Sequence, residues 1–196
     1  PFTTVKKTLE AEYNCPLSDI FLQFNERPFA SGSIGQTHHA LLHDHTPVVV
    51  KVQHPNVSEL VETDLSLFKE SLRILKFVPD LSVINPKEIF TEIQTSLLTE
   101  IDTQIEIKNG IEFYRLNNND GIIRVPKVYP KYSASKILVN QAMPGQSIKK
   151  LIATKATEKN KPLRTTLAKT LVKNFIKQVF IDNYFHADPH PGNILF

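Results

Sequence analysis

The feature that most constrains the fold of this chain is a change in hydrophobic periodicity near residue 54. Across residues 24–53 polar and apolar residues alternate in short runs, and the run at 48–52 is rich in β-branched residues. That pattern predicts the strands of a sheet. Beyond it, apolar residues recur at spacings of three and four, which predicts helices. Strands and helices in one chain predict a mixed fold, which we class as α+β.

Helical spacing is found in four segments. The first covers residues 4–13 and the last covers residues 163–183. Another begins at a cap on Asn56 or Ser58, and its apolar stripe runs to Leu75. Each of these segments is expected to form an amphipathic helix.

The remaining helical segment has the clearest start signal in the sequence. Asn85 is expected as the N-cap, with Pro86 at the first helical position and Glu88 three residues after the cap. The apolar residues that follow recur every four positions, and they are Ile89, Ile93, Leu97, Ile101 and Ile105. This spacing predicts one long helix that ends at the polar turn 117–121. Two strands are expected next, at 125–129 and 136–141, before a break at Met143.

Composition and length limit the classes of function. The chain has 196 residues, 23 of them basic and 20 acidic, and no basic run with interleaved aromatic residues, so no nucleic acid partner is expected. The lone Cys15 excludes an internal disulfide. There is no leader and no apolar run of about 18 to 20 residues, so no targeting or spanning segment is predicted in this chain. Because the chain starts at Pro1 and stops in strand-like sequence at 193–196, we expect a fragment.

The sharpest chemical signal is the loop His-Ala-Asp-Pro-His-Pro-Gly-Asn at 186–193. It places the carboxylate of Asp188 five residues before the amide of Asn193, on a backbone stiffened by two prolines. An aspartate can position a substrate hydroxyl or accept its proton, and an asparagine oxygen can hold a magnesium ion that bridges phosphates. The spacing H-x-D-x-x-x-x-N is that of kinase catalytic loops. A proline-rich turn with Asx caps is the alternative interpretation.

Lys51 interrupts the apolar strand-like run at 48–52. A buried lysine needs an anion, and in kinases that anion is a nucleotide phosphate together with a helix glutamate. The alternative is an edge-strand lysine that extends to solvent.

Small residues form the turn at 29–36, and they would let backbone amides approach a phosphate, although an ordinary hairpin turn is an alternative. The order of small-residue turn, strand lysine, acidic helix and loop matches that of a kinase fold.

The long helix carries Glu100, Asp102, Glu106 and Asn109. At about 100° per residue, Glu100 and Asp102 would point about 200° apart and would serve different partners. Asp102 and Glu106 would form an i, i+4 pair, and the alternative to a functional role is simple solvation. Four histidines fall at 38–45, but the first two would point to opposite faces of a strand, so a solvated hairpin end is favoured over a metal site.

These motifs together resemble the UbiB atypical kinase-like proteins, also called aarF-domain-containing (ABC1) kinases. The segment 29–38 matches the family's alanine-rich loop, and 50–55 matches its lysine strand. The Glu100-x-Asp102 pattern is similar to the family's ExD helix, and 186–193 matches its catalytic loop. The resemblance implies a protein-kinase-like bilobal fold that is truncated within the C-terminal lobe, with the N-terminal nucleotide-binding lobe at 1–142 and the start of the C-terminal lobe at 143–196.

The resemblance also implies roles for individual residues. Ala30, Ser31, Gly32 and Ser33 would cover the nucleotide, and Gln141 and Met143 would lie beside the adenine. Lys51 would engage phosphate and pair with Glu100, while Asp102 and Glu106 would belong to a region that restrains protein phosphorylation. Asp188 would be the catalytic aspartate and Asn193 a magnesium ligand. The loop departs from the family pattern at Ser31 and Gly32, and Gln141 replaces a hinge glutamate.

Family members are ATPases or unorthodox kinases linked to coenzyme Q or other isoprenoid-lipid metabolism. The resemblance therefore implies ATP or ADP and Mg²⁺ as cofactors. A lipid or quinone precursor, a membrane surface and proteins of a quinone-synthesis complex are the implied partners. It places the protein in a mitochondrion or plastid, or at the cytoplasmic membrane face of a bacterium. The alternatives are a pseudokinase regulator and a small-molecule phosphotransferase. Because the family's KxGQ and DFG motifs are expected outside residues 1–196, phosphoryl transfer by these residues alone is not expected.

Overall fold

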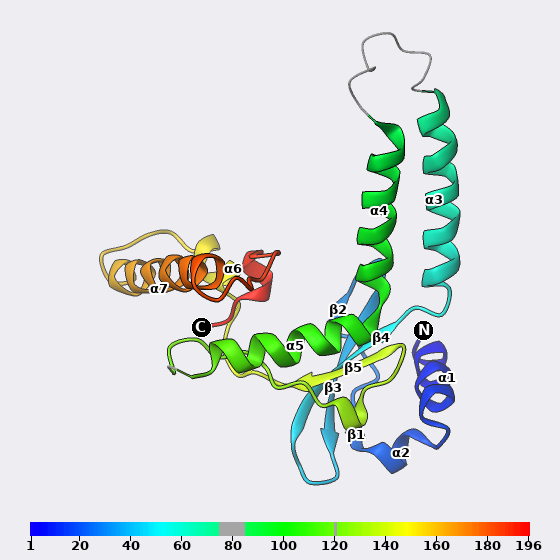
Figure 1. Cartoon of the computed structure of the whole chain (residues 1–196). Helices are drawn as coiled ribbons and strands as arrows, with labels where there is room; N and C mark the ends of the chain where they lie inside the picture. Colours follow the sequence, from blue (N-terminus) through cyan, green and yellow to red (C-terminus); the bar gives the residue numbers. More distant parts are fainter. Residues whose placement is uncertain (75–84, 120) are drawn as a thin grey trace. The chain divides into compact units, whose positions relative to one another are not determined.

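A computed structural model describes residues 1–74, 85–119 and 121–196 of the chain. These residues form two compact units (Figure 1). Unit 1 comprises residues 1–108 and 128–141, and unit 2 comprises residues 109–127 and 142–196. The predicted division into lobes at 1–142 and 143–196 stays a prediction; the described residues of 109–127 cluster with unit 2. Leu75 and Asp120, which belong to an expected helix and an expected turn, lie outside the described residues.

Unit 1 is built on an antiparallel five-stranded sheet. Its strands are β1 (Phe21–Phe24), β2 (Ala30–Ser31), β3 (Gly35–Leu42), β4 (Pro47–Gln53) and β5 (Ile137–Gln141). The order is β1-β3-β4-β5, and the short β2 also pairs with β3. β3 and β4 form a hairpin, with Gly35 opposite Gln53. In its turn Asp44 accepts a bond from the amide of Thr46 at 3.0 Å. The expected sheet at 24–53 is therefore confirmed.

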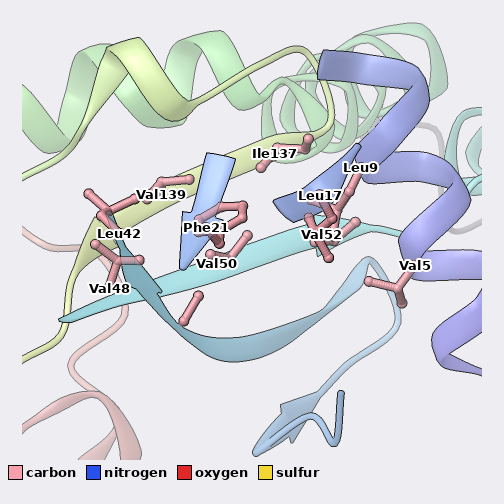
Figure 2. Close-up of a cluster of buried hydrophobic side chains, with 11 residues drawn as sticks. Val5, Leu9, Leu17, Phe21, Leu42, Val48, Val50, Val52, Ile137 and Val139 are labelled. Carbon is pink, nitrogen blue, oxygen red and sulfur yellow. The ribbon is translucent and has the colours of Figure 1, made fainter. Parts of the chain in front are cut away.

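The alternation along β4 gives the sheet two different faces. Val48, Val50 and Val52 are buried on one face, and the odd-numbered residues between them lie on the other. Helices α1 (Phe2–Tyr13) and α2 (Leu17–Ile20) supply further side chains to the valine face (Figure 2). Burial of each valine contributes about 1.5 to 3 kcal/mol to folding, so this face fixes the register of the hairpin.

The opposite face of the sheet is covered by a smaller apolar cluster. Its members are Ile107, Val128 and Leu138, all buried. Leu138 lies directly opposite Lys51 in the pairing of β4 with β5. Because paired residues point to the same face, Lys51 leaves the sheet on the side where Ile107 of helix α5 packs.

Two long helices follow the sheet. Helix α3 (Val57–Ile74) and helix α4 (Pro86–Ile101) pack together, and the rings of Phe68 and Phe90 stack at 6.5 Å. The expected start of α4 is confirmed: the side chain of Asn85 accepts from the amide of Lys87 at 3.1 Å. The Asn85 side-chain amide also donates to the carboxylate of Glu88 at 2.7 Å, which ties the cap to the first turn of the helix.

The prediction of one helix from Asn85 to the polar turn was wrong. The helix ends at Ile101, Asp102 adopts an extended conformation with φ −85° and ψ 100°, and a second helix, α5 (Thr103–Asn117), begins directly after it. The Asp102 carboxylate accepts from the amides of Gln104 and Ile105, as an N-cap does. The isoleucine stripe concealed this junction because its spacing continues through the break.

The expected strand at 125–129 was also wrong. Val128 forms an isolated bridge with Asn140, and Tyr129 donates its amide to Val139 at 2.8 Å. A short 3₁₀ helix, η3 (Pro130–Tyr132), then follows. Pro126 and Pro130 lack the N–H groups that a regular ladder requires, so the pairing of the segment 125–129 with β5 is limited to the residues between these prolines.

Unit 2 contains the second part of α5, together with α6 (Ile148–Ala153), α7 (Lys161–Phe180) and a 3₁₀ helix, η4 (Pro191–Asn193). The residues after η4 pair with the segment before α6, where Gln146 and Phe196 exchange two backbone bonds of 3.0 Å. Gly145 begins this segment at φ +130°, which favours glycine. No helix in the described parts of either unit is long and apolar enough to cross a membrane.

Candidate functional site

Lys51 forms an ion pair with the first turn of helix α5. Its ammonium lies 2.9 Å and 2.8 Å from the two carboxylate oxygens of Glu106. The side chains are 34% and 40% exposed, so the pair lies at a partly solvated surface of unit 1. A strand lysine held by a helix glutamate is the arrangement that kinases use to present an ammonium group to nucleotide phosphates.

The partner expected for Lys51 was a different residue, and that expectation was wrong. Glu100 is exposed near the end of α4, and its side chain has no hydrogen bond or ion pair with any described residue. The change of direction at Asp102 explains the difference, because it begins a new helix whose first turn carries Glu106. The argument that Glu100 and Asp102 point about 200° apart assumed a continuous helix, so it does not apply here.

The small-residue turn between β2 and β3 lies at the surface of unit 1. Ala30, Ser31, Gly32 and Ser33 are all exposed. The turn is closed by a bond from the Gly32 amide to the Gly35 carbonyl at 2.9 Å. The Ser33 amide has no hydrogen-bond partner within the described residues, so it is available to an anion.

Two further residues fix the shape of this turn, and the sequence analysis gave neither a role. The backbone amide of His54 donates to the Ile34 carbonyl at 2.9 Å, and its Nε2 lies 3.1 Å from the Gly32 carbonyl. Since that carbonyl can only accept, Nε2 carries the proton. A Cβ on Gly35 would lie 2.4 Å from the Val52 carbonyl oxygen, so this position requires glycine. The signal that could have revealed His54 is its place three residues after Lys51.

The two residues expected beside an adenine lie where the chain passes from one unit to the other. Gln141 ends β5 in unit 1, opposite Val48, and it is exposed. Met143 is half-buried at the start of the second stretch of unit 2. Their role stays a prediction.

The loop at 186–193 in unit 2 is ordered by bonds between its own residues. The Asp188 amide donates to Nδ1 of His186 at 3.1 Å, and the Asp188 carboxylate accepts from the His190 amide at 3.1 Å. Nδ1 of His190 in turn accepts from the Gly192 amide at 3.0 Å. These short-range bonds hold Asp188 exposed at the bend of the loop.

Asp188 and Asn193 lie in direct contact. The Asn193 side-chain amide donates to the second carboxylate oxygen of Asp188 at 2.9 Å. Because a carboxylate only accepts, this bond turns the NH₂ group of Asn193 toward Asp188 and leaves its oxygen without a partner among the described residues. A free amide oxygen next to a carboxylate fits Mg²⁺, which usually takes one or two protein oxygens and completes its shell with water and phosphates. The described residues contain no group of three or more His, Cys, Asp or Glu side chains that could hold a metal ion.

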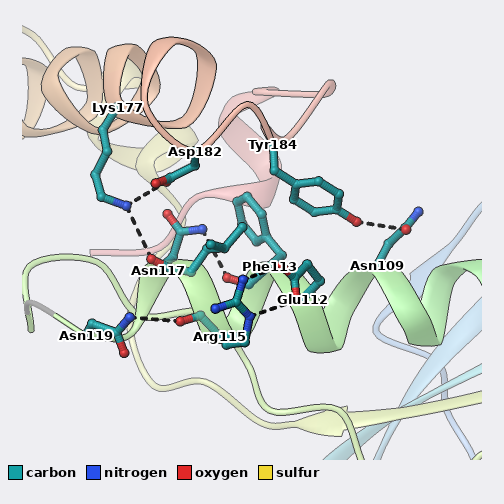
Figure 3. A network of polar contacts seen from close by, with 10 residues as sticks. Asn109, Glu112, Phe113, Arg115, Asn117, Asn119, Lys177, Asp182 and Tyr184 are labelled. Carbon is teal, nitrogen blue, oxygen red and sulfur yellow. Dashed lines mark hydrogen bonds and ion pairs between the residues drawn. The ribbon is translucent and has the colours of Figure 1, made fainter.

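A polar network joins this loop to helix α5 within unit 2 (Figure 3). The Tyr184 hydroxyl donates to Asn109 at 2.8 Å, and Lys177 donates to Asp182 at 2.6 Å. Gln178, which is 5% exposed, accepts from the His186 amide at 3.2 Å and donates to Asn117 at 3.3 Å. Burial, followed by the charge of nearby Glu112, raises the pKa of Tyr184. The residues before the loop are therefore fixed on α5 by side chains of which the sequence analysis singled out only Asn109.

The first two histidines of the group at 38–45 point to opposite faces of β3, as expected, but the expectation of a solvated hairpin end was wrong for His38. His38 is fully buried against Phe24, with Nδ1 2.8 Å from the Asn25 carbonyl, whereas His39 is exposed and stacks on Phe29. Burial lowers the pKa of His38, although the bond to Asn25 acts in the opposite direction. His38 is therefore a neutral core residue.

The family model described as the ABC1 atypical kinase-like domain matches residues 1–196, the whole chain. The chain belongs to the ABC1 atypical kinase-like family. The expected family and the α+β kinase-like fold are thus confirmed.

Curated relatives of this ABC1 domain come from bacteria and a plant. A Clostridium pasteurianum protein named for the 5′ region of hydrogenase 1 is 36% identical over 99% of this chain and 36% of its own length. The chloroplastic protein ACTIVITY OF BC1 COMPLEX KINASE 7 of Arabidopsis thaliana is 36% identical over 96% of this chain and 27% of its own length. A probable protein kinase UbiB of Shewanella baltica is 33% identical over 96% of this chain and 34% of its own length.

The ABC1 domain also resembles a solved structure. Rv3197 from Mycobacterium tuberculosis, in a complex with erythromycin, matches with a TM-score of 0.79 and 25% identity. The match covers 100% of this chain and 48% of that one. This chain therefore spans about half of that protein, and between 27% and 36% of the length of the three curated relatives.

Proposed function

We propose that this chain binds a magnesium-complexed adenine nucleotide, ATP or ADP, as part of an ATPase or unorthodox kinase. The observation that carries the proposal is the bidentate pair between Lys51 and Glu106. The carboxylate of Glu106 accepts two of the three N–H bonds of the Lys51 ammonium and so fixes the direction of the lysine side chain. The third N–H remains to donate to a phosphate oxygen.

Each of the other candidate residues has a part in this proposal. The exposed turn Ala30–Ser33 supplies backbone amides to the phosphates, since its side chains are too small to block the approach. Gln141 and Met143 contact the adenine. Glu100 and Asp102 take no direct part in nucleotide binding, and Asp102 acts by capping the helix that carries Glu106.

The loop in unit 2 supplies the chemistry of phosphoryl transfer. Asp188 orients the attacking hydroxyl or water and accepts its proton. The free oxygen of Asn193 is a ligand for Mg²⁺, which neutralises charge on the phosphates when it is bound. Further metal and substrate contacts would come from other parts of a longer protein, so turnover belongs to that protein rather than to these residues alone.

The names of the relatives bear on the wider role. Resemblance to UbiB-type proteins supports a link to coenzyme Q or another isoprenoid lipid, with a quinone precursor, a membrane surface and proteins of a quinone-synthesis complex as partners. The plant relative is named as chloroplastic and the Shewanella relative is bacterial, which supports an organelle or a bacterial membrane face as the location.

Equilibrium binding of a fluorescent ATP analogue, competed by ATP and by ADP, tests the nucleotide proposal. We expect saturable, magnesium-dependent binding to the wild-type chain and at least about tenfold weaker binding to Lys51→Ala, which removes the charged donor. Equal affinity of both proteins for the nucleotide would refute the role of Lys51.

A second measurement separates an ATPase from a pseudokinase. ADP release is measured for a longer protein that contains this chain, with the wild-type residue and with Asp188→Asn. An ATPase loses turnover in the variant while it still binds nucleotide. Nucleotide binding without ADP release in either form would instead support the pseudokinase alternative.

A further inference from the structure

The end of strand β4 holds helix α5 at two points. Lys51 and Gln53 are two residues apart, so both side chains leave the same face of the sheet. Lys51 binds Glu106, and the Gln53 side-chain amide donates to the Ile101 carbonyl at 2.6 Å and to the Thr103 hydroxyl at 3.0 Å. Side chains of the strand therefore bind both the junction that precedes α5 and the first turn of that helix.

The bonds of Gln53 replace a helical bond that the junction lacks. In a continuous helix the Ile105 amide would donate to the Ile101 carbonyl, four residues earlier. Here the Ile105 amide is turned toward the Asp102 carboxylate, 3.4 Å away, and the Ile101 carbonyl accepts from Gln53 instead. Thr103, the second acceptor of Gln53, is 3% exposed, so water cannot readily take the place of the amide.

We propose that Gln53 is a positioning residue that sets the direction of α5 and thereby holds Glu106 against Lys51. Gln53 itself contacts neither Lys51 nor Glu106 by a hydrogen bond; it acts through the helix junction between them. Without the side-chain amide of Gln53, the Ile101 carbonyl has no donor. The two hydrogen bonds that favour a break at Asp102 over a continuous helix are then lost. The effect on nucleotide affinity rests on the function proposed above, whereas the effect on the Lys51–Glu106 pair does not.

The variant Gln53→Met tests this proposal because it keeps the length of the side chain and removes the amide. Gln104→Met is the matched control: it makes the same change in the first turn of α5, where the side chain is exposed and makes one long bond of 3.4 Å. We expect Gln53→Met to weaken magnesium-nucleotide binding about tenfold, the factor that one buried hydrogen bond typically contributes. Gln104→Met should change the affinity less than twofold.

A double-mutant cycle separates positioning from general damage. If Gln53 acts through Glu106, the loss of affinity caused by Gln53→Met disappears in a Glu106→Gln background. If Gln53 only stabilises unit 1, the two losses multiply, and that result would overturn the proposal. Should Gln53→Met fail to fold, Gln53→Asn takes its place, since its shorter amide cannot reach both acceptors.

A measurement without nucleotide keeps the two proposals distinguishable. The lysines are labelled with ¹³C and ¹⁵N without chemical modification, and the side-chain εCH₂ NMR signal of Lys51 is assigned from its absence in Lys51→Arg. We expect the Lys51 signal of Gln53→Met to move toward its position in Glu106→Gln, and that of Gln104→Met to stay at the wild-type position. A wild-type signal in Gln53→Met would refute the positioning role even if nucleotide binds. Failure of the wild-type chain to bind nucleotide would refute only the proposed function.

Discussion

The ion pair between Lys51 and Glu106 leads to a prediction about stability that also decides between two candidate partners. Both side chains are more than a third exposed, Lys51 at 34% and Glu106 at 40%. Solvent screening therefore limits the coupling free energy to the range of surface pairs, about 0.2 to 1 kcal/mol. The bidentate geometry places this pair in the upper part of that range, so we expect a coupling of about 0.5 to 1 kcal/mol.

The assay is a double-mutant cycle in urea unfolding with Lys51→Met, Glu106→Gln and the double variant. The matched cycle replaces Glu106→Gln by Glu100→Gln, and its coupling should be below about 0.3 kcal/mol because those side chains are not paired. In 1 M NaCl, where the Debye length is about 3 Å, the first coupling should shrink toward the second. A larger coupling to Glu100 than to Glu106 would refute the assignment of the partner.

Three further changes test separate parts of the fold, each by urea unfolding. Gly35→Ala puts a Cβ 2.4 Å from a carbonyl oxygen on β4 and should cost about 1 to 3 kcal/mol, whereas Gly32→Ala, with nothing within 4 Å, should cost far less. Burial lowers the pKa of His38 in the folded state, whereas in the unfolded chain this histidine titrates at about 6.5. Below that pH the unfolded chain binds more protons than the folded chain. The free energy of unfolding should therefore decrease as the pH is lowered, by up to about 1.4 kcal/mol per pH unit. His38→Gln should flatten that slope and His39→Gln should leave it unchanged; an unchanged slope in His38→Gln would contradict the assignment. Tyr184→Phe loses a 2.8 Å bond and should cost about 1 kcal/mol, so an unaltered midpoint would count against the network in unit 2.

Local signals in the sequence were sufficient for much of the fold. The β-branched run at 48–52 predicted strand β4, because alternate valines pack on one face of the sheet. Asn85, Pro86 and Glu88 predicted the start of α4, because capping depends on residues within one turn. These features are encoded by neighbours in the chain, so no long-range contact was needed to infer them.

The predictions from sequence were wrong where contacts between distant residues determine the local structure. The break at Asp102 depends on Gln53, a residue 48 positions from the carbonyl that it binds. Nothing in the isoleucine spacing contains that contact, and the partner of Lys51 was misassigned for the same reason. The burial of His38 was likewise set by aromatic rings from α1 and β1 that pack over it.

The candidate site shows the same division. The sequence singled out Lys51, Asp188 and Asn193 because their residue types and spacing match the chemistry that we propose. It gave no role to His54 or to Gln178, whose effect is exerted through backbone groups of other segments. Residues that position others are recognised from contacts rather than from spacing.

The thermal unfolding of the wild-type chain with nucleotide and magnesium tests the central claim most directly. At a concentration of about 100 times its Kd, a ligand that binds the folded state adds about 2.7 kcal/mol. We therefore expect ATP or ADP with Mg²⁺ to raise the melting temperature by several degrees, and we expect little or no rise for Lys51→Ala or when magnesium is omitted. An unchanged melting temperature of the wild-type chain with every nucleotide, with and without magnesium, would contradict the account.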